Sequence, residues 1–149
     1  MITYRSLKAR LTAILKKTFP GYKVYFDNVE KSEAPYFYVE LTPQKNRTFD
    51  GDGIYHERSV DVDMQMVLPE DRHGRVDRTT LHDNFLTLDK AIRPVFLIED
   101  RAITILDADI KIHDDILYYG FTLYFADAEI DQVEYELMQE LSLNLDKEA

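Results

Sequence analysis

The sequence predicts an α+β domain in which a mostly antiparallel sheet of about five strands is covered by two helices. Two segments place apolar residues at helical spacing, and five segments have the β-branched, aromatic or alternating composition of strands. The length of 149 residues fits one compact domain. The elements follow the order α-β-β-β-α-β-β, and a further acidic helix is predicted at the C-terminus.

The first helix is predicted to begin behind Thr3, a residue type that often caps a helix N-terminus. Apolar residues recur at helical spacing from Tyr4 to Leu15, and Pro20-Gly21 ends the helix. Residues 1–20 contain no acidic residue and five basic ones, Arg5, Lys8, Arg10, Lys16 and Lys17. This positive segment stands out in a chain with 28 acidic and 18 basic residues and a net charge of -10.

Three strands are predicted between the two helices. Residues 22–26 and 36–41 are rich in aromatic and β-branched residues, and residues 60–68 alternate apolar with polar residues. Such alternation is typical of an antiparallel strand with one buried face and one solvated face. Residues 44–54 contain two Asp-Gly pairs, and we predict that they form a polar loop that projects from the sheet.

The second helix is predicted from a cap at Asp77 to Pro94, with apolar residues at Leu81, Phe85, Leu88 and Ile92. The last two strands are predicted to form a hairpin through His113-Asp114-Asp115. In the first of them we expect a bulge near residue 106, and the core-facing residues are Leu106, Ala108, Ile110 and Ile112. In the second the core-facing residues are Leu117, Tyr119, Phe121, Leu123 and Phe125.

The chain is predicted to divide into an α+β domain, residues 1–126, and an acidic extension, residues 127–149. The extension holds eight acidic residues and one lysine, a net charge of -7. Its apolar residues recur at every fourth position, which predicts an amphipathic helix through Val133, Leu137, Leu141 and Leu145. We expect this helix to dock on the basic first helix of its own chain or of an adjacent subunit, because opposite charges steer association.

The composition argues against several classes of protein. The excess of acidic residues disfavours a general binder of nucleic acid or of anionic membranes. The absence of cysteine removes disulfides, thiol nucleophiles and cysteine-ligated metal sites. No stretch approaches the roughly 18 apolar residues of a membrane span, and Met1 leads into a charged segment. We therefore expect a soluble, intracellular protein.

Paired carboxylates are the strongest candidates for catalysis. Asp61 and Asp63 share one face of a predicted strand, and Asp107 and Asp109 share one face of another. If these strands were neighbours, the four acids would resemble a two-metal site, so a metal-dependent nuclease or phosphatase is the alternative function. Alternation of acidic with apolar residues is equally what a solvated sheet face looks like.

Other signals for chemistry are weaker. The residues His113-Asp114-Asp115 coincide with a predicted turn, and the run Asp50-Gly51-Asp52-Gly53 lacks the glycine that a calcium loop needs at its sixth position. His82 is expected to be a solvated residue of the second helix. The chain has no glycine-flanked serine elbow, dinucleotide fingerprint or phosphate loop. The sequence therefore predicts a non-enzymatic protein with no catalytic residue, metal or cofactor.

Tyrosines on the solvated faces of the predicted strands indicate an interface. The chain has 10 tyrosines and 8 phenylalanines, and aromatic residues are enriched in protein–protein interfaces. The residues expected at an interface lie on the strands, in the loop at residues 44–54 and in the C-terminal helix: Tyr36, Tyr38, Tyr118, Tyr124, Lys45, Arg47, Phe49, Ile54, Val133, Leu137 and Leu141.

Several short sequence segments, which start at the end of the first amphipathic helix, occur in a distinctive order. They are Phe19-Pro20 and residues 34–41, 57–62, 67–71 and 117–125, which read APYFYVEL, ERSVDV, VLPED and LYYGFTLYF. Over about residues 1–126 the chain thereby resembles the tail terminator, or tail completion, proteins of tailed phages and prophages of Gram-positive bacteria.

The resemblance implies a structural virion protein. Such proteins form a ring, commonly a hexamer, that ends polymerisation of the tail tube at its head-proximal end and provides the docking surface for the head connector. The implied partners are copies of the chain itself, the tail tube protein and the head–tail connector protein, with DNA passing through the lumen without specific binding. The implied location is the virion tail, and the host cytoplasm during assembly. A plain adaptor domain is a third hypothesis.

Overall fold

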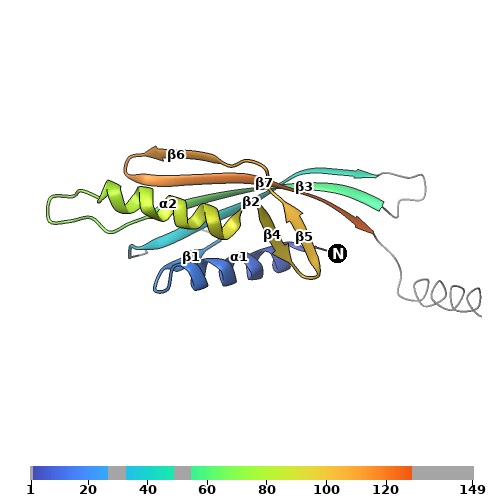
Figure 1. Ribbon diagram of the computed structural model, residues 1–149, viewed down its shortest axis with the longest axis horizontal. Helices are drawn as coiled ribbons and strands as arrows, with labels where there is room; N and C mark the ends of the chain where they lie inside the picture. The colour runs from blue at the N-terminus through green and yellow to red at the C-terminus, as the bar shows by residue number, and fades with distance from the viewer. Residues whose placement is uncertain (1, 27–32, 49–54, 129–149) are drawn as a thin grey trace, which may run out of the picture.

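The computed structural model describes residues 2–26, 33–48 and 55–128. These residues form a five-stranded sheet, two helices and a separate β-hairpin (Figure 1). The elements are α1 (Tyr4–Thr18), β1 (Lys23–Tyr25), β2 (Tyr36–Thr48), β3 (Tyr55–Val67), α2 (Arg78–Ile92), β4 (Val95–Ile98), β5 (Arg101–Thr104), β6 (Asp109–His113) and β7 (Ile116–Ala128).

The main sheet has the strand order β1-β2-β3-β7-β6. Strand β1 runs parallel to β2, and the remaining neighbours are antiparallel. Strands β4 and β5 pair only with each other. The predicted fold class, an α+β domain with a mostly antiparallel sheet and two covering helices, is confirmed.

Both helices begin at the predicted caps. The Thr3 hydroxyl accepts a hydrogen bond from the amide of Ser6, and the Ser6 hydroxyl in turn accepts one from the amide of Thr3. The Asp77 carboxylate accepts a hydrogen bond from the amide of Thr79. These bonds satisfy amide groups that have no partner inside a helix, so the sequence fixes both starting points locally.

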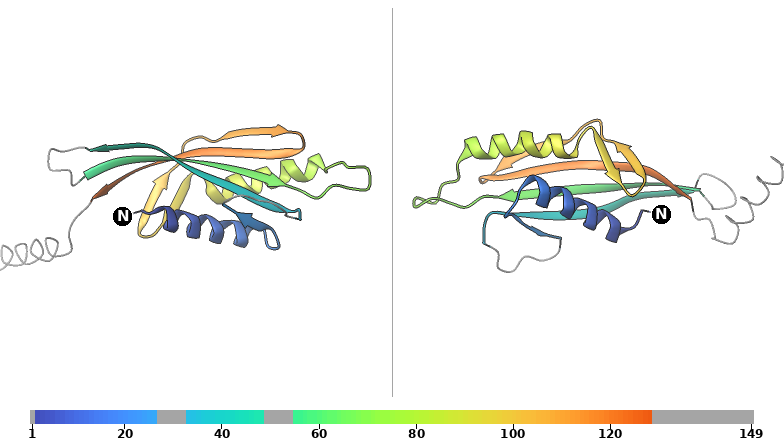
Figure 2. Two further views of the ribbon diagram at one scale, coloured as in Figure 1. Left: turned by 180° about the vertical axis from the view of Figure 1, so that it is seen from behind. Right: turned by 60° about the horizontal axis from the view of Figure 1, so that its bottom comes forward.

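The core lies between the sheet and the two helices, which cover the same face of the sheet (Figure 2). Every second residue points into this core in residues 37–41 of β2, residues 60–66 of β3 and residues 117–127 of β7, as the alternation predicts. The helices contribute buried residues at helical spacing: Leu7, Leu11, Ile14, Leu15, Leu81, Leu88 and Ile92. The opposite face of the sheet has no helix over it within the described residues.

The prediction that a strand crosses residue 106 is wrong. Residues 105–108 separate β5 from β6, and Leu106 is 86% exposed, so it does not face the core. Ile110 lies on the helix side of the sheet opposite Tyr119 but is 45% exposed, whereas Ala108 and Ile112 pack against the core as predicted. Ile103 and Ile105 are buried instead. The change in parity that suggested a bulge marks the passage of the chain from the β4–β5 hairpin to the main sheet.

The loop predicted at residues 44–54 is shorter than expected. Strand β2 continues through Thr48, and its last residues pair with β3 across a register shift between Pro43 and Lys45. Residues 49–54, with Phe49, Ile54 and both Asp-Gly pairs, lie outside the described residues. The predicted C-terminal helix with Val133, Leu137 and Leu141 also lies outside them.

Strand β7 extends to Ala128, two residues beyond the predicted end of the α+β domain. Asp127 is consequently part of the sheet, although the sequence analysis placed it in the acidic extension. Neither helix in the described part of the chain is long and apolar enough to cross a membrane.

Candidate functional site

The face of the main sheet opposite the helices is the candidate interaction surface. Strand register sets its side chains in rows, one of which crosses from Glu40 on β2 through Asp63 and Gly120 to Asp109 on β6. We call this surface the open sheet face and define it by Tyr36, Tyr38, Glu40, Thr42, Asp61, Asp63, Gln65, Asp109, Lys111, Tyr118, Gly120 and Thr122.

The predicted interface tyrosines lie on this side of the sheet. Tyr36, Tyr38 and Tyr118 are half-buried, and Tyr124 is 65% exposed. In the strand register Tyr38 and Tyr118 flank Gln65 in the row next to the acidic one. The structure therefore brings the tyrosines of β2 and β7 onto one surface, and their participation in binding stays a prediction.

Lys45 and Arg47, the other predicted interface residues that the structure describes, are exposed on the distal part of β2. They lie beyond the register shift, on the part of the strand that pairs with residues 56–59. Arg47 is the register partner of Glu57, so its charge is close to an opposite charge within the same chain. These two residues are therefore separate from the acidic row.

A hollow of about 230 Å³ lies over Gly120 in the middle of the open sheet face. Its lining includes Asp61, Asp63, Asp109 and Thr122. A Cβ atom at position 120 would lie only 2.9 Å from Oδ1 of Asp63, so a larger residue would displace that carboxylate. Glycine at this position therefore keeps the centre of the acidic row open.

The carboxylates around the hollow repel one another. Burial raises the pKa of Asp63, and the charges of Asp61, Glu40 and Asp109 raise it further. Asp61 accepts a hydrogen bond from the Thr122 hydroxyl at 2.7 Å. The Thr122 hydroxyl brings no positive charge, and Lys111 is the one cation among the residues that define the open sheet face, so this face carries a net negative charge.

Replacing Asp63 with asparagine is expected to raise the melting temperature at neutral pH, because it removes a charge that partial burial and the neighbouring carboxylates destabilise. A raised pKa means that the charged carboxylate costs stability above that pKa, and protonation relieves the cost as the pH falls. The gain should therefore shrink below neutral pH and vanish below the ordinary value of 3.8. Thermal melts between about pH 3 and 7 test this. A gain that persists at the acid end contradicts the electrostatic explanation.

Three of the four carboxylates of the nuclease or phosphatase alternative, Asp61, Asp63 and Asp109, line the same hollow, but they are not placed as metal ligands. Strand β7 lies between β3 and β6, so Asp63 and Asp109 are separated by Gly120. Asp107 is exposed in the segment before β6 and is not on the sheet. Within the described residues, no group of three or more histidines, aspartates and glutamates is placed to hold a metal ion. The geometry therefore gives this alternative no support.

The histidine–aspartate motif is a hairpin turn, as predicted. Asp114 and Asp115 have φ values of 50° and 60° and connect β6 to β7. His113 lies 3.3 Å from the Asp114 carboxylate on the exposed surface. His82 is exposed on α2, and the calcium-like run at residues 50–53 lies outside the described residues.

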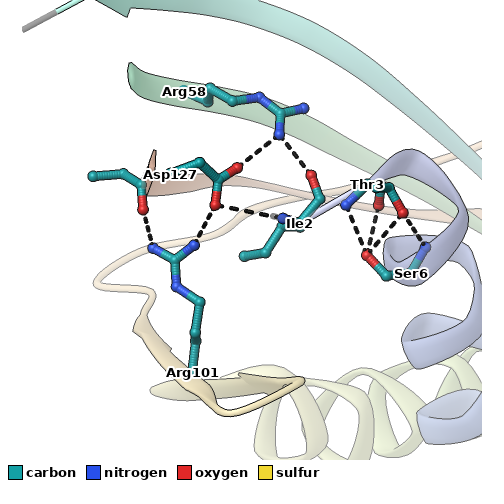
Figure 3. A network of polar contacts seen from close by, with 7 residues as sticks. Ile2, Thr3, Ser6, Arg58, Arg101 and Asp127 are labelled. Carbon is teal, nitrogen blue, oxygen red and sulfur yellow. Dashed lines mark hydrogen bonds and ion pairs between the residues drawn. The ribbon is translucent and has the colours of Figure 1, made fainter. Parts of the chain in front are cut away.

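A buried carboxylate that the sequence analysis missed ties the N-terminal residues to three strands (Figure 3). Asp127 is 3% exposed and accepts hydrogen bonds from Arg58 at 2.9 Å, Arg101 at 2.5 Å and the amide of Ile2 at 3.4 Å. Arg58 also donates to the carbonyl of Ile2, and Arg101 donates to the carbonyl of Ala126. The sequence could have indicated that this residue is buried, because Asp127 continues the series of alternate, inward-facing positions in β7.

The helix α1 presents positive charge on the outside of the domain. Arg5, Lys16 and Lys17 are exposed. Arg10 donates a hydrogen bond to the carbonyl of Leu97 at 2.6 Å, and Lys8 lies 4.7 Å from the centre of the Tyr4 ring. Three of the five basic residues of α1 are thus exposed, and two are held against the domain.

Comparison with known proteins gives one family. A family model described as "Phage tail terminator protein" matches residues 6–136, which include almost all of the described fold and the first residues after β7. No curated protein sequence matches the chain. Among the solved structures that are similar, one matches over 88% of this chain and 99% of its own, with 14% sequence identity and a TM-score of 0.48.

Proposed function

Because the chain belongs to the phage tail terminator protein family, we propose that it closes the head-proximal end of the phage tail tube as a ring of identical subunits. The family establishes a structural role in the tail, and with it a location in the virion tail. The finer proposal is that the ring ends tube polymerisation and provides the docking surface for the head–tail connector protein. Assembly in the host cytoplasm belongs to the same proposal.

The observation that supports this function best is the one-sided packing of the sheet. Both helices and the β4–β5 hairpin cover one face (Figure 2). The other face leaves half-buried tyrosines and an acidic row without a covering element among the described residues. A protein that acts through surfaces needs such a face, whereas an enzyme needs converging reactive groups. The proposed partners are further copies of the chain, in a ring of six, the tail tube protein and the connector protein.

The acidic balance of the chain suits a ring through which DNA passes. A net charge of -10 repels phosphate, so DNA would cross the lumen without being held. We propose no catalytic residue, metal or cofactor for this function.

Loss of the protein should uncouple tail growth from tail completion. In the phage that encodes it, a stop codon early in the reading frame is expected to give tubes of uncontrolled length without attached heads. Expression of the intact chain from a plasmid should restore tails of uniform length. Electron microscopy of lysates measures both properties. Tails of normal length that carry heads, in the absence of the protein, would contradict the proposal.

A further inference from the structure

We propose that the open sheet face binds one side of helix α1 from a second copy of this chain. That side, which we call the exposed stripe, consists of Arg5, Ala9, Ala13 and Lys16. The inference rests on the proposed function, because it names the two surfaces by which neighbouring subunits of the ring would meet. The contact is head-to-tail, since a different surface of each copy takes part. Such a contact repeats from copy to copy and closes into a ring when the rotation allows it.

The charge of the open sheet face selects the kind of partner. Four carboxylates and one lysine, Lys111, lie on it, so its net charge is negative. Burial raises the pKa of Asp63, and the charges of Asp61, Glu40 and Asp109 raise it further. A partner that brings positive charge relieves this repulsion, whereas DNA would increase it. Residues 129–149, with seven acidic residues and one lysine, are disfavoured as occupants for the same reason.

Helix α1 has the charge that this face requires. It carries five basic residues and no acidic residue, whereas α2 carries two basic and two acidic residues. Its exposed stripe consists of residues three or four positions apart, which therefore lie along one side of the helix: Arg5, Ala9, Ala13 and Lys16. The stripe has a cation at each end and small residues in the middle.

The dimensions of the two surfaces agree. Arg5 and Lys16 are 11 positions apart, which is about 17 Å along a helix axis. Glu40 and Asp109 are three strand spacings apart, which is about 14 Å across a sheet. A helix that lies across the strands can therefore place one cation near each end of the acidic row. Ala9 and Ala13 would then lie over Gly120, where the missing side chain allows close approach.

The helix must come from another copy. In its own chain, α1 covers the opposite face of the sheet (Figure 2). Its residues Leu7 and Leu11 are buried in the core. Moving it to the open sheet face would expose this core. The occupant is therefore a second copy rather than the same chain.

Charge reversal with mixing tests the contact. The variant Arg5→Glu/Lys16→Glu and the variant Glu40→Lys/Asp109→Lys should each associate at least tenfold more weakly than the natural chain. An equimolar mixture should recover the association, because each acidic helix then meets a basic sheet face. Sedimentation velocity of the full chain measures the mass, and it should fall as salt rises above about 0.1 M. Matched controls reverse two exposed charges elsewhere, in Arg72→Glu/Lys90→Glu and Glu70→Lys/Asp83→Lys, and should associate normally.

Cross-linking provides a second measurement, because the chain contains no cysteine. A mixture of Ala13→Cys and Thr122→Cys should form a mixed disulfide dimer on mild oxidation, and a mixture of Ala13→Cys and His82→Cys should form much less. Equal yields from the two mixtures would overturn the proposal, as would failure of the charge-reversed mixture to recover association. If tail completion still requires the protein in that case, the inference about the surfaces fails while the proposed function stands.

Discussion

Replacing Asp127 with alanine is expected to lower the free energy of unfolding by about 3–5 kcal/mol, because two arginines then lose a buried ionic partner. The carboxylate accepts hydrogen bonds from Arg58, Arg101 and the amide of Ile2, and it is 3% exposed. No other carboxylate in the described part of the chain bonds both arginines. The substitution also releases the N-terminal residues from β7, so the effect includes the packing of Ile2, which is fully buried.

Urea titration of the natural chain and the variant measures this loss. Since total stabilities of domains are about 5–15 kcal/mol, the variant should unfold at clearly lower urea and melt roughly 10 °C lower or more. The control is Asp83→Ala on the exposed side of α2, where a change within about 0.5 kcal/mol is expected. A loss below about 1 kcal/mol for Asp127→Ala would show that the network contributes little net stability.

The parts of the fold that local chemistry determines could be predicted from the sequence. Thr3 and Asp77 cap their helices through hydrogen bonds to residues two or three positions away, and the β6–β7 turn uses residues that tolerate positive φ. The alternation of β3 correctly indicated which of its residues are buried. In each case the signal and the structure it specifies lie within a few residues of each other.

The parts that depend on distant partners could not be predicted. Strands β4 and β5 have only four residues each, and they form a strand pair that packs on the core rather than joining the main sheet. The faces of Asp63 and Asp109 were predicted, but only the strand order shows that Gly120 separates them. Asp127 breaks the rule that inward positions are apolar, because two arginines from other strands compensate its charge.

Removing residues 130–149 is expected to strengthen self-association by about tenfold, because we expect these acidic residues, which follow Asp127 in the chain, to compete with the open sheet face of another copy for α1. Asp127, three residues before the deletion, is bonded to Ile2, two residues before α1 begins. The deleted residues hold six acidic residues and one lysine, so the truncation also removes half of the net charge of -10 that makes copies repel one another.

The same truncation separates two explanations of how α1 is used. The sequence alone predicts that the acidic helix docks on α1 and bridges subunits, in which case the truncated chain would stay folded and lose oligomeric mass. If α1 binds the open sheet face instead, the oligomeric mass of the truncated chain should be retained or increased. Light scattering across a range of salt concentrations distinguishes these outcomes, with a thermal melt to show that the domain is folded. Deletion of residues 137–149, which lie beyond the family match, serves as the control for the part of the segment that the family shares. Loss of mass on the longer deletion would identify the acidic segment, rather than the sheet face, as the surface that α1 binds.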